Sequence, residues 1–361
     1  MSEANAKPTP CALIMAGGTG GHIFPGIAVG IALREQGWRV HWLGAPNSME
    51  SDLVPPHGFP FEPVNFGGVR GKGLMTWLRM PWRLMRSTGQ ALKAISRVKP
   101  DVVVGMGGYI TVPGGLATLI MGRTMILHEQ NSRAGLANRV LSWVADRVYT
   151  AFPHVLDKGL WVGNPLREAF IQQDAPAERF ANRSGPLQIV VVGGSLGARA
   201  LNDTLPAALA LMPAERRPKV LHQSGKNNIE ALEQAYTAAG VDARTTPFID
   251  NTAEAFAQAD LVIARSGAST VTELAAVGAA ALFIPFPHAV DDHQTSNAAF
   301  LVDKSAGWMM SQPEFTPERV AQWLSDMDRE QLLQAALKAK ALARTGAVRA
   351  ITSACSEVIA R

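Results

Sequence analysis

Cysteine is scarce in this chain, since only Cys11 and Cys355 occur among 361 residues. Two thiols cannot form a disulfide framework or a cysteine-rich zinc site, and their number fits a reducing cytosol. An excess of one charge is also missing, because 34 Lys and Arg stand against 30 Asp and Glu. This balance argues against a nucleic-acid-coating protein. The first ten residues are polar and no apolar stretch follows a basic start, so we expect no secretion signal.

Several catalytic motifs are absent as well. There is no G-x-x-x-x-G-K-[ST] loop, no H-E-x-x-H pair and no G-x-S-x-G elbow, which argues against P-loop, zincin and serine-hydrolase chemistry. One uncharged run, residues 102–122, is nominally long enough to cross a bilayer. It contains six glycines and Pro113, so we interpret it as a buried strand, a loop and a helix instead.

Short β-branched runs alternate with helical stretches along the whole chain, which predicts two α/β domains with parallel sheets covered by helices. The expected strands are residues 12–15, 39–43, 101–104, 124–128, 147–150, 188–192, 219–222, 260–264 and 280–284. Residues 172–186 are polar, contain Pro and Gly, and lack a period, so we expect a linker or long loop there. The two halves begin alike, with LIMAGGTGGHIFPG and IVVVGGSLGARALN. After Gly307 we expect mainly helix, and the last helix shows one apolar face.

The first glycine-rich loop, residues 17–21, ends a strand and precedes His22 at a helix start. Glycines let the backbone approach a ligand closely, and the free N–H groups of a helix start favour an anion. A dinucleotide site is disfavoured because Ile23 stands where the third glycine of G-x-G-x-x-G would be. The next strand also ends without the acid that would hold an adenosine ribose.

A third glycine site, RSGASTVTE, follows the strand at residues 260–264. Its small residues at a helix start suit a phosphate. Glu273 lies about one turn further on, where a carboxylate could accept hydrogen bonds from both hydroxyls of a ribose. The alternative is an ordinary acid that the helix dipole favours near the N-terminus.

Three further polar groups end strands or begin loops: HEQN at residues 128–131, GNPLR at residues 163–167 and PFPHAVDDHQ at residues 285–294. In the last group Asp291, Asp292 and His293 resemble a metal site superficially, but solvated loop charges explain them better. A separate segment, residues 69–86, carries five cations, two tryptophans and no acid. This composition is typical of an interfacial membrane contact, and a solvated amphipathic helix is the alternative.

Eight motifs of the chain occur in the order and spacing of one family. GGTGGHIFPG, GMGGY, HEQN, GNPLR, GGSLGARALN, the Phe248-Ile249-Asp250 triplet, RSGASTVTE and the Gln294 loop resemble the MurG family, the bacterial peptidoglycan N-acetylglucosaminyltransferases. The resemblance runs from about Leu13 to Gly307. His293 departs from it, because many members have a second Gln there.

The resemblance implies a GT-B architecture of two Rossmann-like parallel-sheet domains facing a cleft. Residues 1–166 would form the acceptor and membrane side, residues 167–343 the donor side, and residues 344–361 a helix returning to the first domain. The implied reaction transfers N-acetylglucosamine, with inversion, from UDP-N-acetylglucosamine to the 4-hydroxyl of the muramoyl sugar of lipid I, giving lipid II. No metal or other cofactor is expected. The implied location is the cytoplasmic face of the inner membrane, on an anionic surface, with cell-wall synthesis proteins as possible partners and no nucleic acid.

The family's functional residues carry over to positions of this chain. His22 would be the catalytic base or a group placed on the diphosphate. Apart from the resemblance, Glu129 at the end of the HEQN strand is a weaker candidate base. The implied donor-binding residues are Thr19, Gly20, Gly21, Asn131, Arg167, Ser195, Ile249, Ala268, Ser269, Thr270, Val271, Thr272, Glu273 and Gln294. The implied membrane contacts are Lys72, Leu74, Trp77, Leu78, Arg79, Trp82 and Arg83. Two alternatives stay open: a UDP-sugar epimerase of the same architecture, and a nucleic-acid-binding protein that uses the basic segment.

Overall fold

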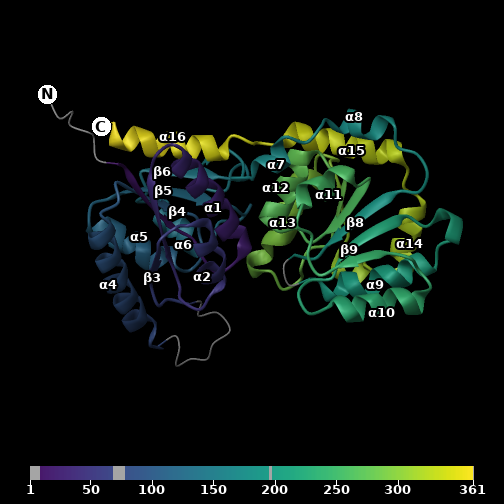
Figure 1. The fold of residues 1–361 in the computed structure, drawn as a ribbon, viewed down its shortest axis with the longest axis horizontal. Coiled ribbons are helices and arrows are strands. Elements are labelled where there is room, and N and C mark those ends of the chain that lie inside the picture. Colours follow the sequence, from purple (N-terminus) through teal and green to yellow (C-terminus); the bar gives the residue numbers. More distant parts are fainter. Residues whose placement is uncertain (1–8, 68–77, 195–196, 361) are drawn as a thin grey trace. The chain divides into compact units, whose positions relative to one another are not determined.

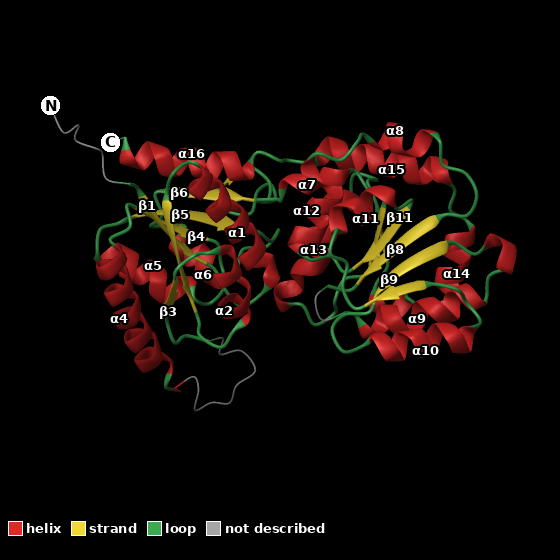
Figure 2. Ribbon diagram, in the orientation of Figure 1, coloured by secondary structure: helices red, strands yellow, loops and turns green. Residues whose placement is uncertain are grey.

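The computed structural model describes residues 9–67, 78–194 and 197–360 (Figure 1). The chain forms two compact units, Met1–Leu166 together with Thr345–Arg361, and Arg167–Arg344. Each unit is built on one sheet whose strand pairs are all parallel (Figure 2). The predicted α/β class with two parallel sheets is therefore confirmed.

The sheet of the first unit has the order β3-β2-β1-β4-β5-β6-β7. Its strands are β1 (Cys11–Met15), β2 (Arg39–Gly44), β3 (Phe61–Pro63), β4 (Val102–Gly105), β5 (Thr124–Glu129), β6 (Arg147–Thr150) and β7 (Leu160–Trp161). The helices are α1 (Gly20–Glu35), α2 (Met49–Leu53), η1 (Pro55–His57), α4 (Met80–Val98), α5 (Thr111–Ile120), α6 (Leu136–Leu141) and α16 (Ala347–Ile359). The order reverses at β1, so the loops after β1 and β4 meet at the carboxyl edge, where α/β sheets bind ligands.

Side-chain alternation explains why both faces of this sheet are covered. Ile14 packs on one face with residues of α1 and α16, whereas Leu13 and Met15 pack on the other face with residues of α4, α5 and α6. Every residue of β1 is buried. A strand buried on both faces needs a continuous apolar run, and CALIM supplies one.

The sheet of the second unit has the order β10-β9-β8-β11-β12-β13. Its strands are β8 (Gln188–Val192), β9 (Lys219–Gln223), β10 (Arg244–Thr246), β11 (Leu261–Ala264), β12 (Ala281–Phe283) and β13 (Trp308–Met309). The α-helices are α7 (Glu168–Ile171), α8 (Pro176–Ala181), α9 (Arg199–Ala210), α10 (Ile229–Ala239), α11 (Thr252–Gln258), α12 (Ala268–Val277), α13 (His293–Val302), α14 (Pro317–Ser325) and α15 (Arg329–Leu342). Short 3₁₀ turns are η2 (Ala214–Arg216), η3 (Val290–Asp292) and η4 (Gln312–Glu314).

The last helix, α16, belongs to the first unit, as the resemblance implied. It packs against α1 (Figure 1). Ile351 and Cys355 are fully buried in the same cluster as Ile14, and Val358 packs against that cluster. The apolar face read from the sequence is therefore the face that holds the chain's end on the first unit.

The uncharged run at residues 102–122 forms β4, a loop and α5, as predicted. Over the described ranges, the structure contains no helix whose length and apolar character would let it cross a bilayer. The run is apolar because β4 is buried on both faces.

The prediction of a linker or long loop at residues 172–186 was only partly right, because the range lies inside the second unit and contains a helix. Helix α8 lies inside this range, and its Phe180 is buried. Arg183 just beyond it forms an ion pair of 2.8 Å with the fully buried Asp260. A six-residue helix is too short to show a 3.6-residue period in the sequence. Its stability depends on contacts that nearby arginine side chains make with residues far away in sequence. The short strands β3, β7, β10 and β13 escaped the sequence analysis for the same reason, since two or three residues carry no pattern.

Candidate active site

The loop after β1 has the backbone geometry that its glycines indicated. Gly18 has a φ of 90°, in the left-handed region, and α1 begins at Gly20 with Thr19 as its N-cap residue. A Cβ on Gly17 would lie 2.4 Å from a carboxylate oxygen of Glu50. The loop is therefore tightly held, and residues 19–21 form the start of a 16-residue helix.

Glu50 is a structural residue of this loop that the sequence analysis missed. It is fully buried, and its carboxylate accepts hydrogen bonds from the backbone N–H of Gly18 at 3.1 Å and of Ala45 at 3.1 Å. These bonds join the loop after β1 to the loop after β2. A lone acid in a short helix gives no sequence signal for such a role, because its partners are backbone groups, and the one in the glycine loop, Gly18, is 32 residues away.

His22 lies in the first turn of α1, half-buried, at the carboxyl edge of the first sheet. Its Nδ1 is 2.9 Å from Oε1 of Gln130, which directly follows β5. Gly107, which has a φ of 95°, packs against both side chains, and a Cβ there would lie 2.8 Å from Nδ1 of His22. The GMGGY motif thus provides space for His22.

Glu129, the weaker candidate base, is buried at the end of β5 with both carboxylate oxygens engaged. One oxygen accepts from the backbone and side-chain N–H of Asn131, at 2.9 and 3.3 Å. The other accepts from the side chain of Asn138 at 2.9 Å and from the N–H of Gly135 at 3.2 Å. This carboxylate organises the turn between β5 and α6, which favours His22 as the group that faces a substrate.

In the second unit, RSGASTVTE forms the loop and helix start that the sequence predicted. Helix α12 begins at Ala268 after the N-cap Gly267. The hydroxyl oxygens of Ser266 and Ser269 are buried and have no hydrogen-bond partner among the described residues. Unpaired buried hydroxyls beside free helix N–H groups suit the oxygens of a phosphate.

Glu273 lies one turn further along α12. Burial raises the pKa of its carboxyl to about 7, and the nearby positive charge of Arg167 opposes this rise. Within the described residues no hydrogen bond to this carboxyl is present. A ligand that donates hydrogen bonds to this carboxyl would stabilise its charged form.

The remaining predicted donor residues lie on several elements of the second unit. Arg167 is the N-cap residue of α7, with its guanidinium 4.9 Å from the ring centre of Phe170. Ile249 follows β10, and Gln294 is on α13, where its oxygen accepts from the N–H of Phe286 at 2.9 Å. Ser195 lies outside the described residues. The predicted set is thus divided, since Thr19, Gly20, Gly21 and Asn131 belong to the first unit.

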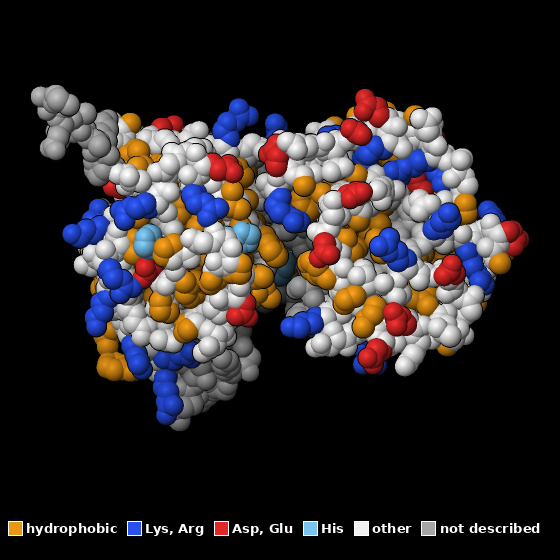
Figure 3. Space-filling model, viewed as in Figure 1, with side chains coloured by type: hydrophobic (Ala, Val, Ile, Leu, Met, Phe, Trp, Pro, Cys, Tyr) orange, Lys and Arg blue, Asp and Glu red, His pale blue; other side chains and the backbone are white. Residues whose placement is uncertain are grey.

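The described part of the predicted membrane segment is the start of α4 and the two residues before it. Leu78, Trp82 and Met85 are exposed by 68%, 65% and 60%. No residue in the first seven positions of α4 is buried, and the helix contains no acid. Hydrophobic and cationic side chains lie together at this end of α4 (Figure 3). Arg79 and Arg83 lie here too, whereas Lys72, Leu74 and Trp77 are outside the described residues.

A second group of exposed apolar side chains, which the sequence did not indicate, lies on α6 and the turn after it. Leu136, Val140 and Trp143 are exposed by 67%, 48% and 71%. Their spacing of four and three residues places them along one side of the helix and the turn after it. Helix α6 packs against α5, which packs against α4, so both groups belong to the helices on one face of the first sheet.

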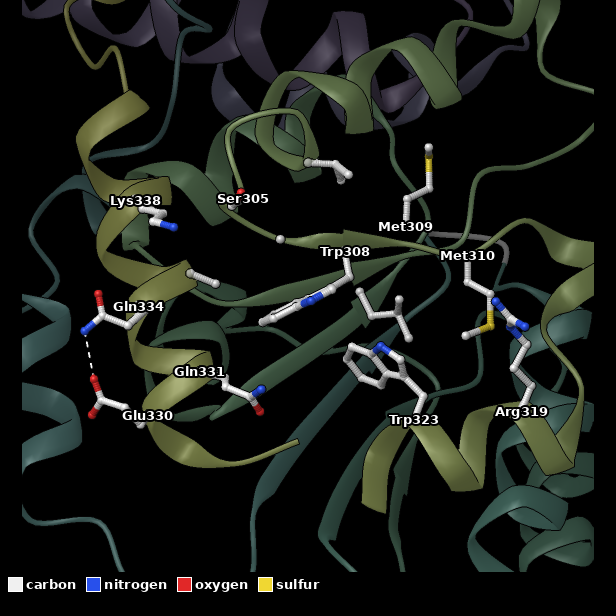
Figure 4. Close-up of a pocket in the computed structure, with 14 residues that line it drawn as sticks. Ser305, Trp308, Met309, Met310, Arg319, Trp323, Glu330, Gln331, Gln334 and Lys338 are labelled. Carbon is white, nitrogen blue, oxygen red and sulfur yellow. Dashed lines mark hydrogen bonds between the residues drawn. The ribbon is translucent and has the colours of Figure 1, made fainter. Parts of the chain in front are cut away.

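A cavity of about 640 Å³ lies beside β13, between α14 and α15 (Figure 4). Trp308 and Trp323 meet in it at 5.6 Å between ring centres, with Arg319 and Lys338 at its rim. None of the predicted donor, catalytic or membrane residues lines it. The cavity therefore involves none of the residues that the sequence singled out as site residues.

Two Rossmann-like units, each with a glycine-rich loop and a helix start at the carboxyl edge of its sheet, define a protein of the two-domain GT-B class. The family model described as glycosyltransferase family 28 N-terminal domain matches residues 12–150, and that described as glycosyltransferase family 28 C-terminal domain matches residues 188–353. The chain belongs to glycosyltransferase family 28.

Individual relatives agree with this assignment. The chain is 62% identical over 349 residues to the UDP-N-acetylglucosamine--N-acetylmuramyl-(pentapeptide) pyrophosphoryl-undecaprenol N-acetylglucosamine transferase of Paracidovorax citrulli, covering 97% of this chain and 98% of the relative. It resembles the crystal structure of Acinetobacter baumannii MurG with a TM-score of 0.84 and 37% identity, over 96% and 99% of the two chains. A Neisseria meningitidis UDP-GlcNAc 2-epimerase has a TM-score of 0.67 at 10% identity, over 96% and 100% of the two chains, which reflects the shared fold alone.

Proposed function

We propose that this protein transfers N-acetylglucosamine from UDP-N-acetylglucosamine to the 4-hydroxyl of the muramoyl sugar in lipid I, and so forms lipid II. The main observation behind this proposal is the position of His22 at the start of α1, directly after the glycine-rich loop. One of its ring nitrogens, Nδ1, is hydrogen-bonded to Gln130. The other nitrogen, Nε2, has no hydrogen-bond partner among the described residues. The names of the relatives supply the substrates, and 62% identity over nearly the whole chain supports the transfer to this protein.

In the proposed reaction His22 acts as general base. Its Nε2 takes the proton of the acceptor hydroxyl while that oxygen bonds to C1 of N-acetylglucosamine. The bond from C1 to the diphosphate oxygen breaks on the opposite side, so UDP leaves with the electron pair and the configuration at C1 inverts. A positioned base typically contributes roughly 10²–10⁴-fold to such a step.

The donor is assigned to the second unit. The diphosphate would bind at the start of α12, where the Ser266 and Ser269 hydroxyls are unpaired, and the helix N-terminus stabilises its charge without a metal. Glu273 would accept the ribose hydroxyls. Gln294 still has its amide N–H groups to offer the sugar, since the described contacts use only its oxygen.

The same proposal places the protein on the cytoplasmic face of the inner membrane. The exposed Leu78, Trp82 and Met85 would enter the lipid interface, while Arg79 and Arg83 meet anionic headgroups. This arrangement suits an enzyme whose acceptor is anchored in lipid.

Incubation of the purified protein with UDP-N-acetylglucosamine, with and without a lipid I analogue, tests the function. We expect release of UDP and formation of the disaccharide lipid only when the analogue is present. Conversion of the sugar nucleotide without any acceptor would indicate an epimerase instead and would refute the proposal.

A further inference from the structure

Three side chains of the first unit form a single chain of hydrogen bonds that ends on a backbone carbonyl. Nδ1 of His22 lies 2.9 Å from Oε1 of Gln130, and Nε2 of Gln130 lies 3.1 Å from Nδ1 of His128. Nε2 of His128 lies 2.9 Å from the carbonyl oxygen of Gly163. The chain therefore joins α1, β5 and the loop after β7.

The Gly163 carbonyl fixes the direction of every bond in this chain. A carbonyl oxygen only accepts, so Nε2 of His128 must carry a hydrogen. His128 is fully buried, and burial lowers its pKa to about 4, so at neutral pH its Nδ1 has a lone pair. Gln130 must then turn its NH₂ toward His128 and its oxygen toward His22.

The consequence at His22 follows from the same rule. Because the Gln130 oxygen only accepts, Nδ1 of His22 carries a hydrogen, and in the neutral imidazole the lone pair is on Nε2. In the opposite orientation of the amide, the Gln130 oxygen would face Nδ1 of His128. Two acceptors would then meet, either there or, if Nδ1 took the hydrogen, between Nε2 of His128 and the Gly163 carbonyl oxygen. The arrangement is also rigid, because His128 and Gln130 are exposed by 0% and 1%.

We propose that Gln130 and His128 are positioning residues that hold His22 in the Nδ1–H tautomer with Nε2 ready to accept a proton. The inference rests on the proposed function for the identity of His22 as base. It goes further because it names the group that determines this tautomer, the backbone carbonyl of Gly163 on a different loop. That carbonyl acts on His22 through the hydrogen bonds of the buried neutral His128 and the Gln130 amide. Neither positioning residue needs to touch the substrate.

The direct test is ¹⁵N NMR of the full-length protein labelled in histidine. The spectrum of a neutral imidazole distinguishes the protonated ring nitrogen from the one with a lone pair. We expect the hydrogen of wild-type His22 on Nδ1 and that of His128 on Nε2, with signals assigned by His22→Ala and His128→Ala spectra. A wild-type His22 with its hydrogen on Nε2 would overturn the inference.

Two substitutions at Gln130 separate positioning from simple packing. Gln130→Met keeps the volume and removes both bonds, and should lower kcat by about 10- to 100-fold, the range found for outer hydrogen-bond partners of metal-bound histidines. The KM for UDP-N-acetylglucosamine should stay unchanged. Gln130→Glu keeps an acceptor for Nδ1–H of His22 but removes the donor to His128, so its ¹⁵N spectrum should still show the His22 hydrogen on Nδ1. Gln130→Met should no longer hold the His22 hydrogen on Nδ1, and a Gln130→Met protein with the wild-type tautomer and the wild-type kcat would refute the proposal.

Gln90→Met is the matched control. Gln90 lies on α4 in the same unit, where its oxygen accepts from the N–H of Asn65 at 2.7 Å, so the variant also removes an amide hydrogen bond. Its kcat should equal that of wild type. The NMR result does not depend on turnover: absence of transfer by wild type would refute the proposed function, whereas transfer with the wrong tautomer would refute this inference alone.

Discussion

The carboxyl of Glu273 makes donor binding depend on pH in a direction that the structure determines. Its pKa is raised to about 7 by burial. Hydrogen bonds from the ribose hydroxyls favour the charged carboxylate, so binding should lower this pKa and release protons. If only the charged form binds well, its fraction rises from roughly one-tenth at pH 6 to nine-tenths at pH 8. Affinity should therefore increase about tenfold over this interval.

Isothermal titration calorimetry with UDP-N-acetylglucosamine measures this effect. The sugar nucleotide is the better ligand, because its diphosphate is esterified at both ends and does not titrate near neutral pH, unlike that of UDP. Near pH 7, titrations in buffers of different ionisation enthalpy should show release of about half a proton per donor bound.

Glu273→Gln and Glu318→Gln complete the experiment. Glu273→Gln should bind with an affinity that does not change from pH 6 to 8. At pH 8 it should be weaker than wild type by about ten- to a hundredfold, since hydrogen bonds to a charged group are worth roughly 1.5–3 kcal/mol. Glu318 is exposed on α14, so its variant should behave as wild type. A flat wild-type profile, or the same slope in Glu273→Gln, would show that this carboxyl does not hold the donor.

Three further expectations concern the base, the membrane contact and the buried His222. His22→Ala should lower kcat by at least about a hundredfold with unchanged donor affinity, whereas a loss mainly in acceptor KM would assign His22 to acceptor binding. The double variant Trp82→Ser/Arg83→Glu should co-sediment less with anionic vesicles than wild type does, and added salt should weaken the co-sedimentation of wild type. Unchanged sedimentation of the variant would mean that this part of α4 is only a solvated helix. Burial lowers the pKa of His222 to about 3, so the unfolded chain binds its proton first as the pH falls below about 6.5. Urea unfolding at pH 5 should show roughly 2 kcal/mol of stability lost through this residue, so the stability lost between pH 7 and pH 5 should be smaller in His222→Gln than in wild type.

The contacts of the glycine loop explain why the site could be found only in part. The sequence predicted a ligand loop before α1 and a helix start at α12, because glycine and small residues at strand ends have few other uses. It could not indicate Glu50, whose buried carboxylate holds the loop through two backbone N–H groups. It also kept Glu129 as a weaker candidate base behind His22, although hydrogen bonds from Asn131, Gly135 and Asn138 occupy that carboxylate.

The sequence by itself determined the elements whose signal is local. Short continuous apolar runs such as CALIM, bounded by glycine and proline, are typical of central parallel strands, and the spacing of Ile351 and Cys355 marks the buried face of the last helix. Only the tertiary structure decided the relationships between distant residues. It ordered the apparent linker through Arg183 and Asp260 and joined His22 to the Gly163 carbonyl through two intervening side chains. A hydrogen bond between groups more than a hundred residues apart leaves no periodicity in the sequence, so its existence depends on which loops the parallel strands bring to one edge.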